Sequence, residues 1–312
     1  MTDSQLSDLE DRSTQSRVLS WVYLLALFLL LLGMLGLVAG YVVHARVEQR
    51  RVVALQEAMA RVEMLELRLN ETMGAAYLMA GAIVQAQGQD PGLLVDSMAP
   101  LLLQQFPLAA AIQAAPNGVI RHSYPLKGNQ EAIGHDLLVD PARNQEAHLA
   151  VSTRKLTLAG PFSLVQGGVG AVARFPVYVN NSDGWPKFWG FTSVVLRVPR
   201  LLEMAGVVDL QRSGYRYSFC RVRDQNGCEV FAARGDGLPV DPVRVTIAVP
   251  NGQWMLALSP EEGWWRPAEI IILAALCLAL AAAHTALIFY FFKVREARGR
   301  LARAARSVPS AE

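Results

Sequence analysis

Two long runs without a charged residue constrain this chain more than any other feature. The first extends from Val18 to Val43 and the second from Ile270 to Phe292. A helix needs about 20 apolar residues to cross the roughly 30 Å hydrocarbon core of a membrane. Both runs meet that length. The chain is therefore predicted to cross a membrane twice, at residues 18–44 and 265–292, and to hold most of its 312 residues between the two spans.

A cleaved signal peptide is the alternative explanation of the first run, because Val43-His44-Ala45 loosely resembles a cleavage site. Signal peptides have a basic leader and an apolar core of roughly 7–15 residues. Here the leader, residues 1–17, has more acidic than basic residues, and the apolar run is much longer. A spanning helix is the favoured interpretation.

Lysine and arginine residues near the spans predict the orientation, because they concentrate in cytoplasmic segments. The tail at residues 293–312 carries Lys293, Arg295, Arg298, Arg300, Arg303 and Arg306. This tail is predicted to be cytoplasmic and to contact anionic lipid. Residues 1–17 then lie in the cytoplasm too, although three arginines that follow the first span argue weakly for the reverse. The central domain is predicted to be periplasmic, in a bacterial inner (cell) membrane.

A single helical stripe follows the first span. Its apolar residues recur at spacings of three and four, at Val52, Leu55, Met59, Val62, Leu65 and Leu69. Such spacing predicts a helix with one apolar side. We expect a stalk helix at residues 45–88 that ends near Gln87. Its seam fits either pairing with a second copy in a homodimer or packing along its own domain.

Short β-rich runs separated by turns begin near Ala109. They read AAIQAA, VIRHSYPL, KLTLAG, GAVARFPVYV and WGFTSVVLRV, and a helical segment, PRLLEMAGVVDL, follows them. Strand-like sequence then resumes at residues 215–223, 229–233, 243–249 and 254–258. The predicted fold class is α/β, with two sheet modules at 89–200 and 201–264 carried on a long helix and flanked by two transmembrane helices.

Composition and motifs exclude several classes of function. A net charge of +2 implies no general affinity for nucleic acid. The glycine-rich segment 167–170 lacks the lysine of a phosphate loop and is typical of a turn. His135, Asp136 and His148 have no further metal ligand at a suitable spacing, and no GxSxG motif supplies a nucleophile. We predict no enzymatic activity, no metal and no cofactor.

Two cysteines flank a turn signal in the second module. Cys220 and Cys228 lie on either side of Asp224-Gln225-Asn226-Gly227, and an oxidising compartment would permit a disulfide between them. A two-residue turn at Asn226-Gly227 would instead pair Gln225 with Cys228 and leave Cys220 out of reach. The sequence permits the bridge without requiring it.

Three segments resemble the CHASE domain, the extracytoplasmic sensor of many bacterial receptor kinases and nucleotide cyclases and of plant cytokinin receptors. They read APNGVIRHSYPLKGNQEAIGHDLLVDPAR, KLTLAGPFSLVQGGVGAVARFPVYV and FWGFTSVVLRVPRLLEMAG. Their order fits the family, and the resemblance covers nearly the whole segment between the spans. The resemblance implies a long membrane-proximal helix that carries two PAS-like modules, dimerisation through that helix, and a small ligand held in the membrane-distal module.

The resemblance also implies which residues line or shape the distal module. The matching positions are Tyr124-Pro125-Leu126, Gly134-His135-Asp136, Gly160-Pro161-Phe162, Gly167-Gly168 and Phe175-Pro176-Val177-Tyr178. A ligand pocket needs an apolar wall and a few polar groups. The candidate ligand-binding residues are Arg121, Tyr124, His135, Asp136, Leu158, Ala159, Phe162, Phe175 and Tyr178. Turn geometry for the glycines and prolines, and core packing for the aromatic residues, are the alternatives.

One position departs from the plant receptors, which carry a threonine where this chain has Ala159. This departure argues against a cytokinin-like adenine ligand. Only SVPSAE follows Arg306, without a histidine-kinase core, GGDEF, EAL or receiver segment. The chain is thus expected to be either the sensory part of a longer receptor or a subunit that signals to a separate kinase or cyclase.

The predicted function is therefore that of an inner-membrane sensory receptor. A small extracytoplasmic ligand would bind the distal module, and a conformational signal would pass through the second transmembrane helix to an output domain or partner. The alternative is a non-catalytic scaffold or regulatory subunit whose periplasmic domain binds a partner protein.

Overall fold

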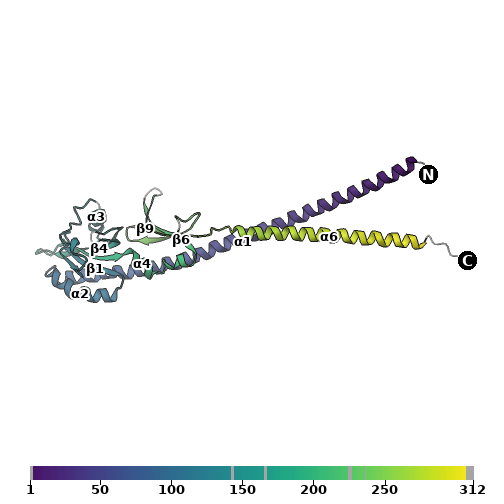
Figure 1. The fold of residues 1–312 in the computed structure, drawn as a ribbon. Helices are drawn as coiled ribbons and strands as arrows, with labels where there is room; N and C mark the ends of the chain where they lie inside the picture. The colour runs from purple at the N-terminus through teal and green to yellow at the C-terminus, as the bar shows by residue number, and fades with distance from the viewer. Residues whose placement is uncertain (1–2, 142–143, 165–166, 224–226, 236, 307–312) are drawn as a thin grey trace. The chain divides into compact units, whose positions relative to one another are not determined.

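The computed structural model describes residues 3–141, 144–164, 167–223, 227–235 and 237–306. The chain divides into two compact units (Figure 1). One comprises Met1–Arg50 with Trp264–Glu312, and the other comprises Arg51–Gly263. The first helix, α1 (Asp3–Gln85), runs through both units without a break.

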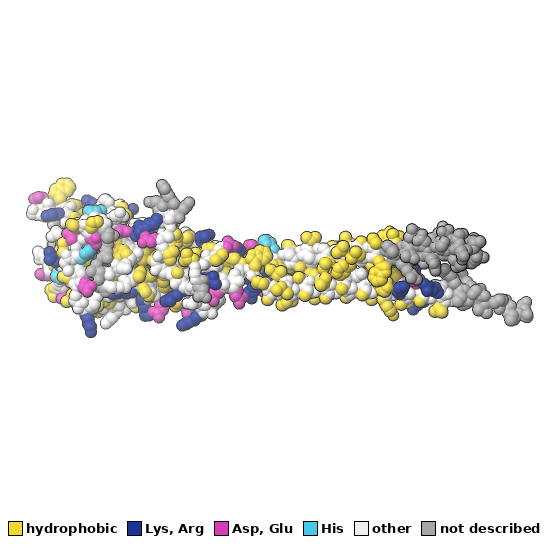
Figure 2. Space-filling model, turned by 45° about the horizontal axis from the view of Figure 1, so that its top comes forward, with side chains coloured by type: hydrophobic (Ala, Val, Ile, Leu, Met, Phe, Trp, Pro, Cys, Tyr) yellow, Lys and Arg dark blue, Asp and Glu magenta, His cyan; other side chains and the backbone are white. Residues whose placement is uncertain are grey.

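The first unit contains the two helices that are long and apolar enough to cross a membrane. Among the described residues, these helices are the first part of α1 and α6 (Pro267–Arg306). Trp21 stacks on Phe289 with ring centroids 5.6 Å apart. Large apolar side chains such as Leu37 and Phe291 are exposed on these helices, and Figure 2 shows the hydrophobic band. Such a surface matches hydrocarbon rather than water.

In the second unit, α1 packs along its own domain. Within the predicted stripe, Leu65 and Leu69 are buried, whereas Val52 and Met59 are exposed. Before and after the buried leucines the helix buries several alanines, namely Ala54, Ala58, Ala75, Ala76 and Ala80, which allow other elements to approach the helix closely. The hydroxyl of Thr192 donates a hydrogen bond of 2.9 Å to the carbonyl oxygen of Ala76. The second half of the stripe therefore packs on the domain, whereas the side chains of its first half are exposed.

The first sheet is antiparallel, with strand order β2-β1-β5-β4-β3. Its strands are β1 (Ala109–Pro116), β2 (His122–Tyr124), β3 (Thr157–Ser163), β4 (Val169–Asn180) and β5 (Pro186–Arg197). The helices of this module are α2 (Pro91–Gln105), η1 (Gln130–Ala132) and α3 (Asn144–Thr153). We call this part the distal module.

The second sheet is also antiparallel, with strand order β7-β6-β9-β8. Its strands are β6 (Tyr215–Arg223), β7 (Gly227–Arg234), β8 (Val243–Val249) and β9 (Gly252–Pro260), and α4 (Val198–Met204) and α5 (Asp209–Arg212) precede them. Tyr217, Phe219 and Trp254 are fully buried on this sheet. We call this part the proximal module. Two antiparallel sheets confirm the predicted α/β class and its division into two sheets.

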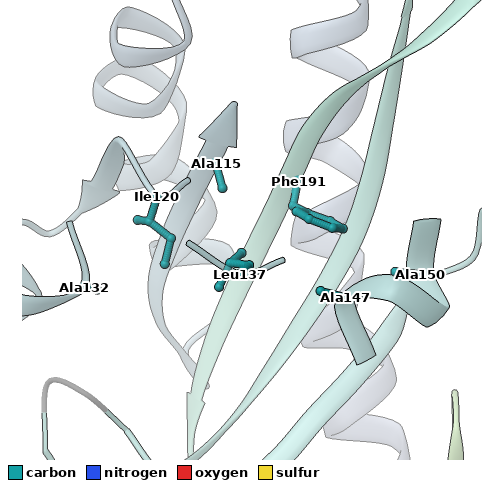
Figure 3. Packing of buried hydrophobic residues seen from close by; sticks show 7 residues of the cluster. All are labelled: Ala115, Ile120, Ala132, Leu137, Ala147, Ala150 and Phe191. Carbon is teal, nitrogen blue, oxygen red and sulfur yellow. The ribbon is translucent and has the colours of Figure 1, made fainter. Parts of the chain in front are cut away.

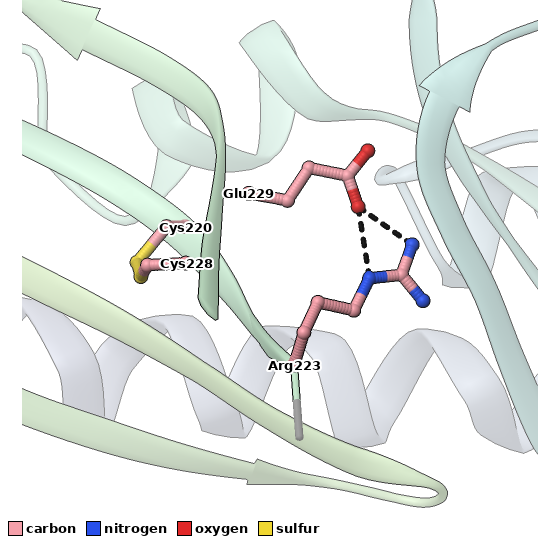
Figure 4. The surroundings of a disulfide bond; sticks show 4 residues. All are labelled: Cys220, Arg223, Cys228 and Glu229. Atoms are coloured by element: carbon pink, nitrogen blue, oxygen red, sulfur yellow. Dashed lines mark hydrogen bonds and ion pairs between the residues drawn. A yellow bond between two sulfur atoms is a disulfide. The ribbon is translucent and has the colours of Figure 1, made fainter. Parts of the chain in front are cut away.

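A disulfide joins Cys220 of β6 to Cys228 of β7 (Figure 4). Of the two alternatives left open by the sequence, the register that would pair Gln225 with Cys228 is not the one observed, because Cys228 pairs with Val222 and Gly227 pairs with Arg223. The rest of the predicted turn, residues 224–226, lies outside the described residues. In this register Cys220 and Cys228 are diagonal neighbours on one face, 5.5 Å apart between Cα atoms, which is within reach of a disulfide.

Two polar contacts join the distal and proximal modules. Arg221 of β6 forms an ion pair with Glu146 of α3, with 2.8 Å between Nη2 and Oε1, and both side chains are largely buried. The backbone N–H of Leu158 on β3 donates a hydrogen bond of 2.6 Å to the side chain of Asn251, at the turn between β8 and β9. The two modules are thus held together by specific contacts as well as by α1.

Candidate functional site

A row of five buried polar side chains crosses the distal sheet from edge to edge. The backbone register pairs Ser123 with Gln113, Gln113 with Ser193, Ser193 with Arg174, and Arg174 with Thr157. Residues directly opposite one another in a sheet project from the same face. All five are at most 7% exposed. Burial of polar groups costs free energy unless they are hydrogen-bonded, and Gln113, Ser123 and Thr157 each take part in a hydrogen bond.

Arg174 is the charged member of the row. It lies in the middle of β4 between apolar neighbours and is 2% exposed. Its guanidinium group remains protonated in a protein. Beside it, the hydroxyl of Ser193 is buried without a hydrogen-bond partner among the described residues, and Gln113 donates to Ser123 at 3.5 Å. The centre of the row therefore offers donors on one face of the sheet.

A cavity of about 30 Å³ lies against this face. Gln113 and Arg174 form its polar wall together with His135. The rest of the lining is apolar and consists of Ile120, Ala132, Leu137, Phe162, Leu164, Val172 and Val195. A water molecule needs roughly 10–15 Å³ by this measure, so the cavity has room for about two water molecules.

The segment 118–140 and helix α3, together called the cavity cover, close this face of the sheet. Backbone hydrogen bonds join Ile120 N to His135 O at 3.0 Å and Gly134 N to Ile120 O at 2.8 Å. Figure 3 shows the apolar cluster beneath the cover, in which Leu137 and residues of α3 share one side of the sheet with Phe191. Its members are Ala115, Ile120, Ala132, Leu137, Ala147, Ala150 and Phe191. The cover therefore packs on the sheet through apolar side chains, several of which are alanines.

The opposite face of the same sheet packs on α1. Phe175 contacts Tyr77 of α1, with ring centroids 4.6 Å apart, and Thr192 bonds to Ala76. Because strand residues alternate between faces, Arg174 and Phe175 project to opposite sides of β4. The cavity and the long helix are thus separated by the thickness of a single sheet.

Four of the nine predicted ligand-binding residues lie on the cavity side. His135 and Phe162 line the cavity, and Nε2 of His135 lies 3.2 Å from Oδ2 of Asp140 in the cover. Ala159 is fully buried opposite Val172 on the cavity face, without lining the cavity itself. The hydroxyl of Tyr178 donates to the backbone oxygen of Val151 in α3 at 2.9 Å, so this residue supports the cover.

The other five lie away from the cavity wall. Leu158 and Phe175 project from the α1 face, and Tyr124 pairs with Ile112 on that same side. Arg121 is exposed. Asp136 is half-buried in the cover, where its Oδ1 accepts a hydrogen bond of 2.9 Å from the backbone N–H of Leu138.

Three polar residues at the centre of the row were not predicted from the sequence, namely Gln113, Arg174 and Ser193. One local signal was available, because Arg174 is a charged residue inside the strand-like run GAVARFPVYV. Charged residues are almost never fully buried without a reason. Among the described residues, no group of three or more His, Cys, Asp or Glu side chains is arranged to hold a metal ion.

Comparison with known proteins decides the family. The model of the CHASE domain matches residues 37–226, which is more than half of the chain. The chain belongs to the CHASE domain family. The resemblance found in the sequence is thereby confirmed, and the matched CHASE residues include the whole distal sheet. A search of curated proteins finds no match.

Two solved structures resemble the chain at low identity. An extracellular ligand binding receptor from Desulfohalobium retbaense DSM5692 has a TM-score of 0.49 at 14% identity, over 67% of this chain and 40% of that one. The periplasmic domain of LuxQ from Vibrio cholerae has a TM-score of 0.38 at 11% identity, over 66% of this chain and 98% of that one. The present chain therefore spans less than half the length of the first of these proteins. The CHASE match and the two long apolar helices together indicate a membrane protein with an extracellular sensory domain.

Proposed function

We propose that this CHASE protein is an inner-membrane receptor whose distal module is PAS-like and binds a small ligand between its five-stranded sheet and the cavity cover. The observation that carries the proposal is the buried polar row, two of whose members, Gln113 and Arg174, line a cavity with an otherwise mainly apolar lining. A few polar groups set in an apolar wall are the usual makeup of a small-molecule site. Of the nine candidate residues, His135 and Phe162 then line the site, Tyr178 supports its cover, and Phe175 packs the sheet on α1.

Signal transmission in this proposal starts from the cover. Helix α3 carries Glu146, which is paired with Arg221 on β6, and β6 is hydrogen-bonded along its length to β9. Residues 261–266 connect β9 to α6. A ligand shifts such an equilibrium only through its different affinity for the two states, and a change from 1:99 to 99:1 requires about 5.5 kcal/mol.

The membrane arrangement and the partners complete the proposal. The domain between the apolar helices is periplasmic, both chain ends are cytoplasmic, and the basic segment 293–306 contacts anionic lipid. Exposed apolar side chains on the membrane-proximal part of α1, including Val52, Val53 and Met59, provide a surface for a homodimer. The signal passes either to an output domain of a longer receptor or to a separate kinase or cyclase.

The test is ligand-induced stabilisation of the full chain in lipid nanodiscs. Purified protein is screened by thermal shift against small carboxylic acids, amines, sugars, purines and short peptides. In the variant Ala132→Trp the indole is larger than the cavity and blocks the space into which a ligand would bind, whereas Ile133→Trp places the same group at an exposed neighbouring position and serves as its control. Circular dichroism establishes that both variants are folded.

We expect at least one compound to stabilise the wild type and Ile133→Trp but not Ala132→Trp. No response in the whole screen, or an undiminished response in folded Ala132→Trp, would refute ligand binding at this site. Capture of a partner protein that is unaffected by Ala132→Trp, combined with an empty screen, would favour the scaffold function instead.

A further inference from the structure

We infer that the ligand of the distal cavity is a small organic carboxylate, with its anionic end on Arg174 and its apolar part against the cavity cover. This inference rests on the proposed function, because it assigns a chemical class to the same site. Its starting point is the polarity of the wall. Of the ten residues that line the cavity, one is a permanently charged cation and none is acidic.

The burial of Arg174 is the first step of the argument. Arg174 lies in the middle of the sheet with 2% of its surface exposed, and it lines the cavity. An anion placed in that cavity would interact with the cation at low effective dielectric, where their attraction is much stronger than in water. The site thus favours a negative charge.

The hydrogen-bonding groups around Arg174 match a carboxylate. A guanidinium group presents donors in a planar fork that fits two carboxylate oxygens. On the same face, the hydroxyl of Ser193 is buried and has no partner among the described residues, and Gln113 lies on the other side of it in the row. One charged fork flanked by a neutral hydroxyl and an amide suits a single negative charge better than the two charges of a phosphate.

The remainder of the lining determines the body of the ligand. Ile120 and Leu137 of the cover face Leu164, Val172 and Val195 on the sheet side of the cavity. An aliphatic group gains about 25 cal/mol for each Å² of apolar surface that it buries. Because the cavity holds only about two water molecules, we expect even a short aliphatic acid to require outward movement of the part of the cover that lines it, segment 118–140. Ligand binding and displacement of segment 118–140 are therefore coupled.

The experiment is isothermal titration of the full chain in nanodiscs with acetate, propionate, butyrate, pyruvate and lactate. The matched neutral probes are propionamide and 1-propanol, and the competing anion is inorganic phosphate. We expect at least one carboxylate to bind, its neutral analogue to bind at least tenfold more weakly, and phosphate not to compete. Loss of a charge-assisted hydrogen-bonding partner weakens binding roughly 10- to 100-fold, which is the expected effect of Arg174→Gln.

Three variants separate the role of Arg174 from general damage to the fold. Ser193→Ala leaves the cation in place and is expected to weaken carboxylate binding about tenfold. Arg174→Lys keeps the charge without the fork and is expected to bind more weakly than wild type but more tightly than Arg174→Gln. Arg197→Gln is the control, since Arg197 lies on the next strand outside the cavity lining, half-buried and bonded to Gly167.

The outcomes distinguish this inference from the proposed function. If a neutral metabolite binds, is blocked by Ala132→Trp, and no carboxylate binds, the receptor function stands and the carboxylate assignment falls. Tighter binding of phosphate than of every carboxylate also overturns the assignment. If nothing binds the folded protein, both proposals fail.

Discussion

Removing the ion pair between the two modules is the most direct test of how the domain holds together. In the variant Glu146→Gln the side chain keeps its size and loses its charge, which leaves Arg221 buried opposite a neutral group. The two side chains are 12% and 16% exposed, with 2.8 Å between the closest charged atoms. Loss of one partner costs 3–5 kcal/mol for a fully buried pair and 0.2–1 kcal/mol for an exposed pair. With most of the pair shielded, the expected loss in the free energy of unfolding is about 2 kcal/mol.

The chain contains a matched control for this measurement. Arg200 and Glu203 are also 2.8 Å apart, but their side chains are 55% and 59% exposed and both lie on α4. Glu203→Gln is therefore expected to cost less than about 1 kcal/mol. For a domain of this size, 1 kcal/mol corresponds to a shift of roughly 2–4 °C in Tm. Thermal unfolding of the full chain in detergent, followed by circular dichroism, should show a fall of about 4–8 °C for Glu146→Gln and a much smaller change for the control.

A double-mutant cycle completes the test. If the charges interact directly, Glu146→Gln with Arg221→Gln will destabilise the protein less than the sum of the two single changes, because neither charge is left alone. Equal Tm shifts for Glu146→Gln and Glu203→Gln, or strictly additive effects in the cycle, would show that burial does not strengthen this pair and would refute the reasoning.

Three further predictions concern the fold. Replacing Cys228 by Ser opens the disulfide with Cys220, which closes a short loop, and should lower the free energy of unfolding by about 2.5 kcal/mol in denaturant titrations under oxidising conditions. Gly190→Ala should prevent accumulation of folded protein, since a Cβ there would lie 2.1 Å from a backbone oxygen of β1, whereas Gly252→Ala, at a similar φ but in open space, should still give folded protein by size-exclusion chromatography. Burial raises the pKa of Tyr217 above its usual value near 10. The folded state should therefore lose stability as the pH rises above 10 and through that raised pKa. Thermal unfolding measured across alkaline pH should show a smaller loss of stability for Tyr217→Phe.

Most of the strands could be predicted from the sequence because their signals are local. Residues 215–223 and 243–249 were expected as strands and form β6 and β8 with those bounds. The run VIRHSYPL, in contrast, contributes only the three residues of β2 to the sheet. The rest of that run forms part of the cover, where its conformation depends on contacts with residues distant in the sequence.

Two helices of the distal module were missed for different physical reasons. Pro91 follows the break after α1 and occupies the first turn of α2, where proline has no hydrogen bond to lose, so it begins a helix that its sequence does not indicate. Helix α3 buries only Ala147 and Ala150, so it lacks the stripe of large apolar residues by which amphipathic helices are recognised. Its place is determined by the sheet beneath it rather than by its own pattern.

The polar row could not have been predicted from the sequence because it is a property of register. Ser123, Gln113, Ser193, Arg174 and Thr157 are scattered over five strands, and a slip of one residue in any pairing would turn a strand's members to the other face. The family resemblance pointed to two residues that line the cavity, His135 and Phe162. Family motifs mark turns and packing positions as readily as ligand contacts, which explains why the others surround the cavity rather than line it.

The position of the row also bears on how the binding of a ligand would affect the helices in the membrane. The first route begins at helix α3 of the cover, and Thr157, the last member of the row, donates a hydrogen bond of 2.9 Å to the backbone oxygen of Glu146 at the start of that helix. This route continues through Arg221 to the proximal sheet and then through residues 261–266, which include Gly263 at a φ of +78°. The second route crosses the sheet from Arg174 to its neighbour Phe175, which contacts α1. Because α1 is a single unbroken helix from Asp3 to Gln85, whereas the first route ends in a non-helical connection, we expect α1 to be the stiffer of the two routes.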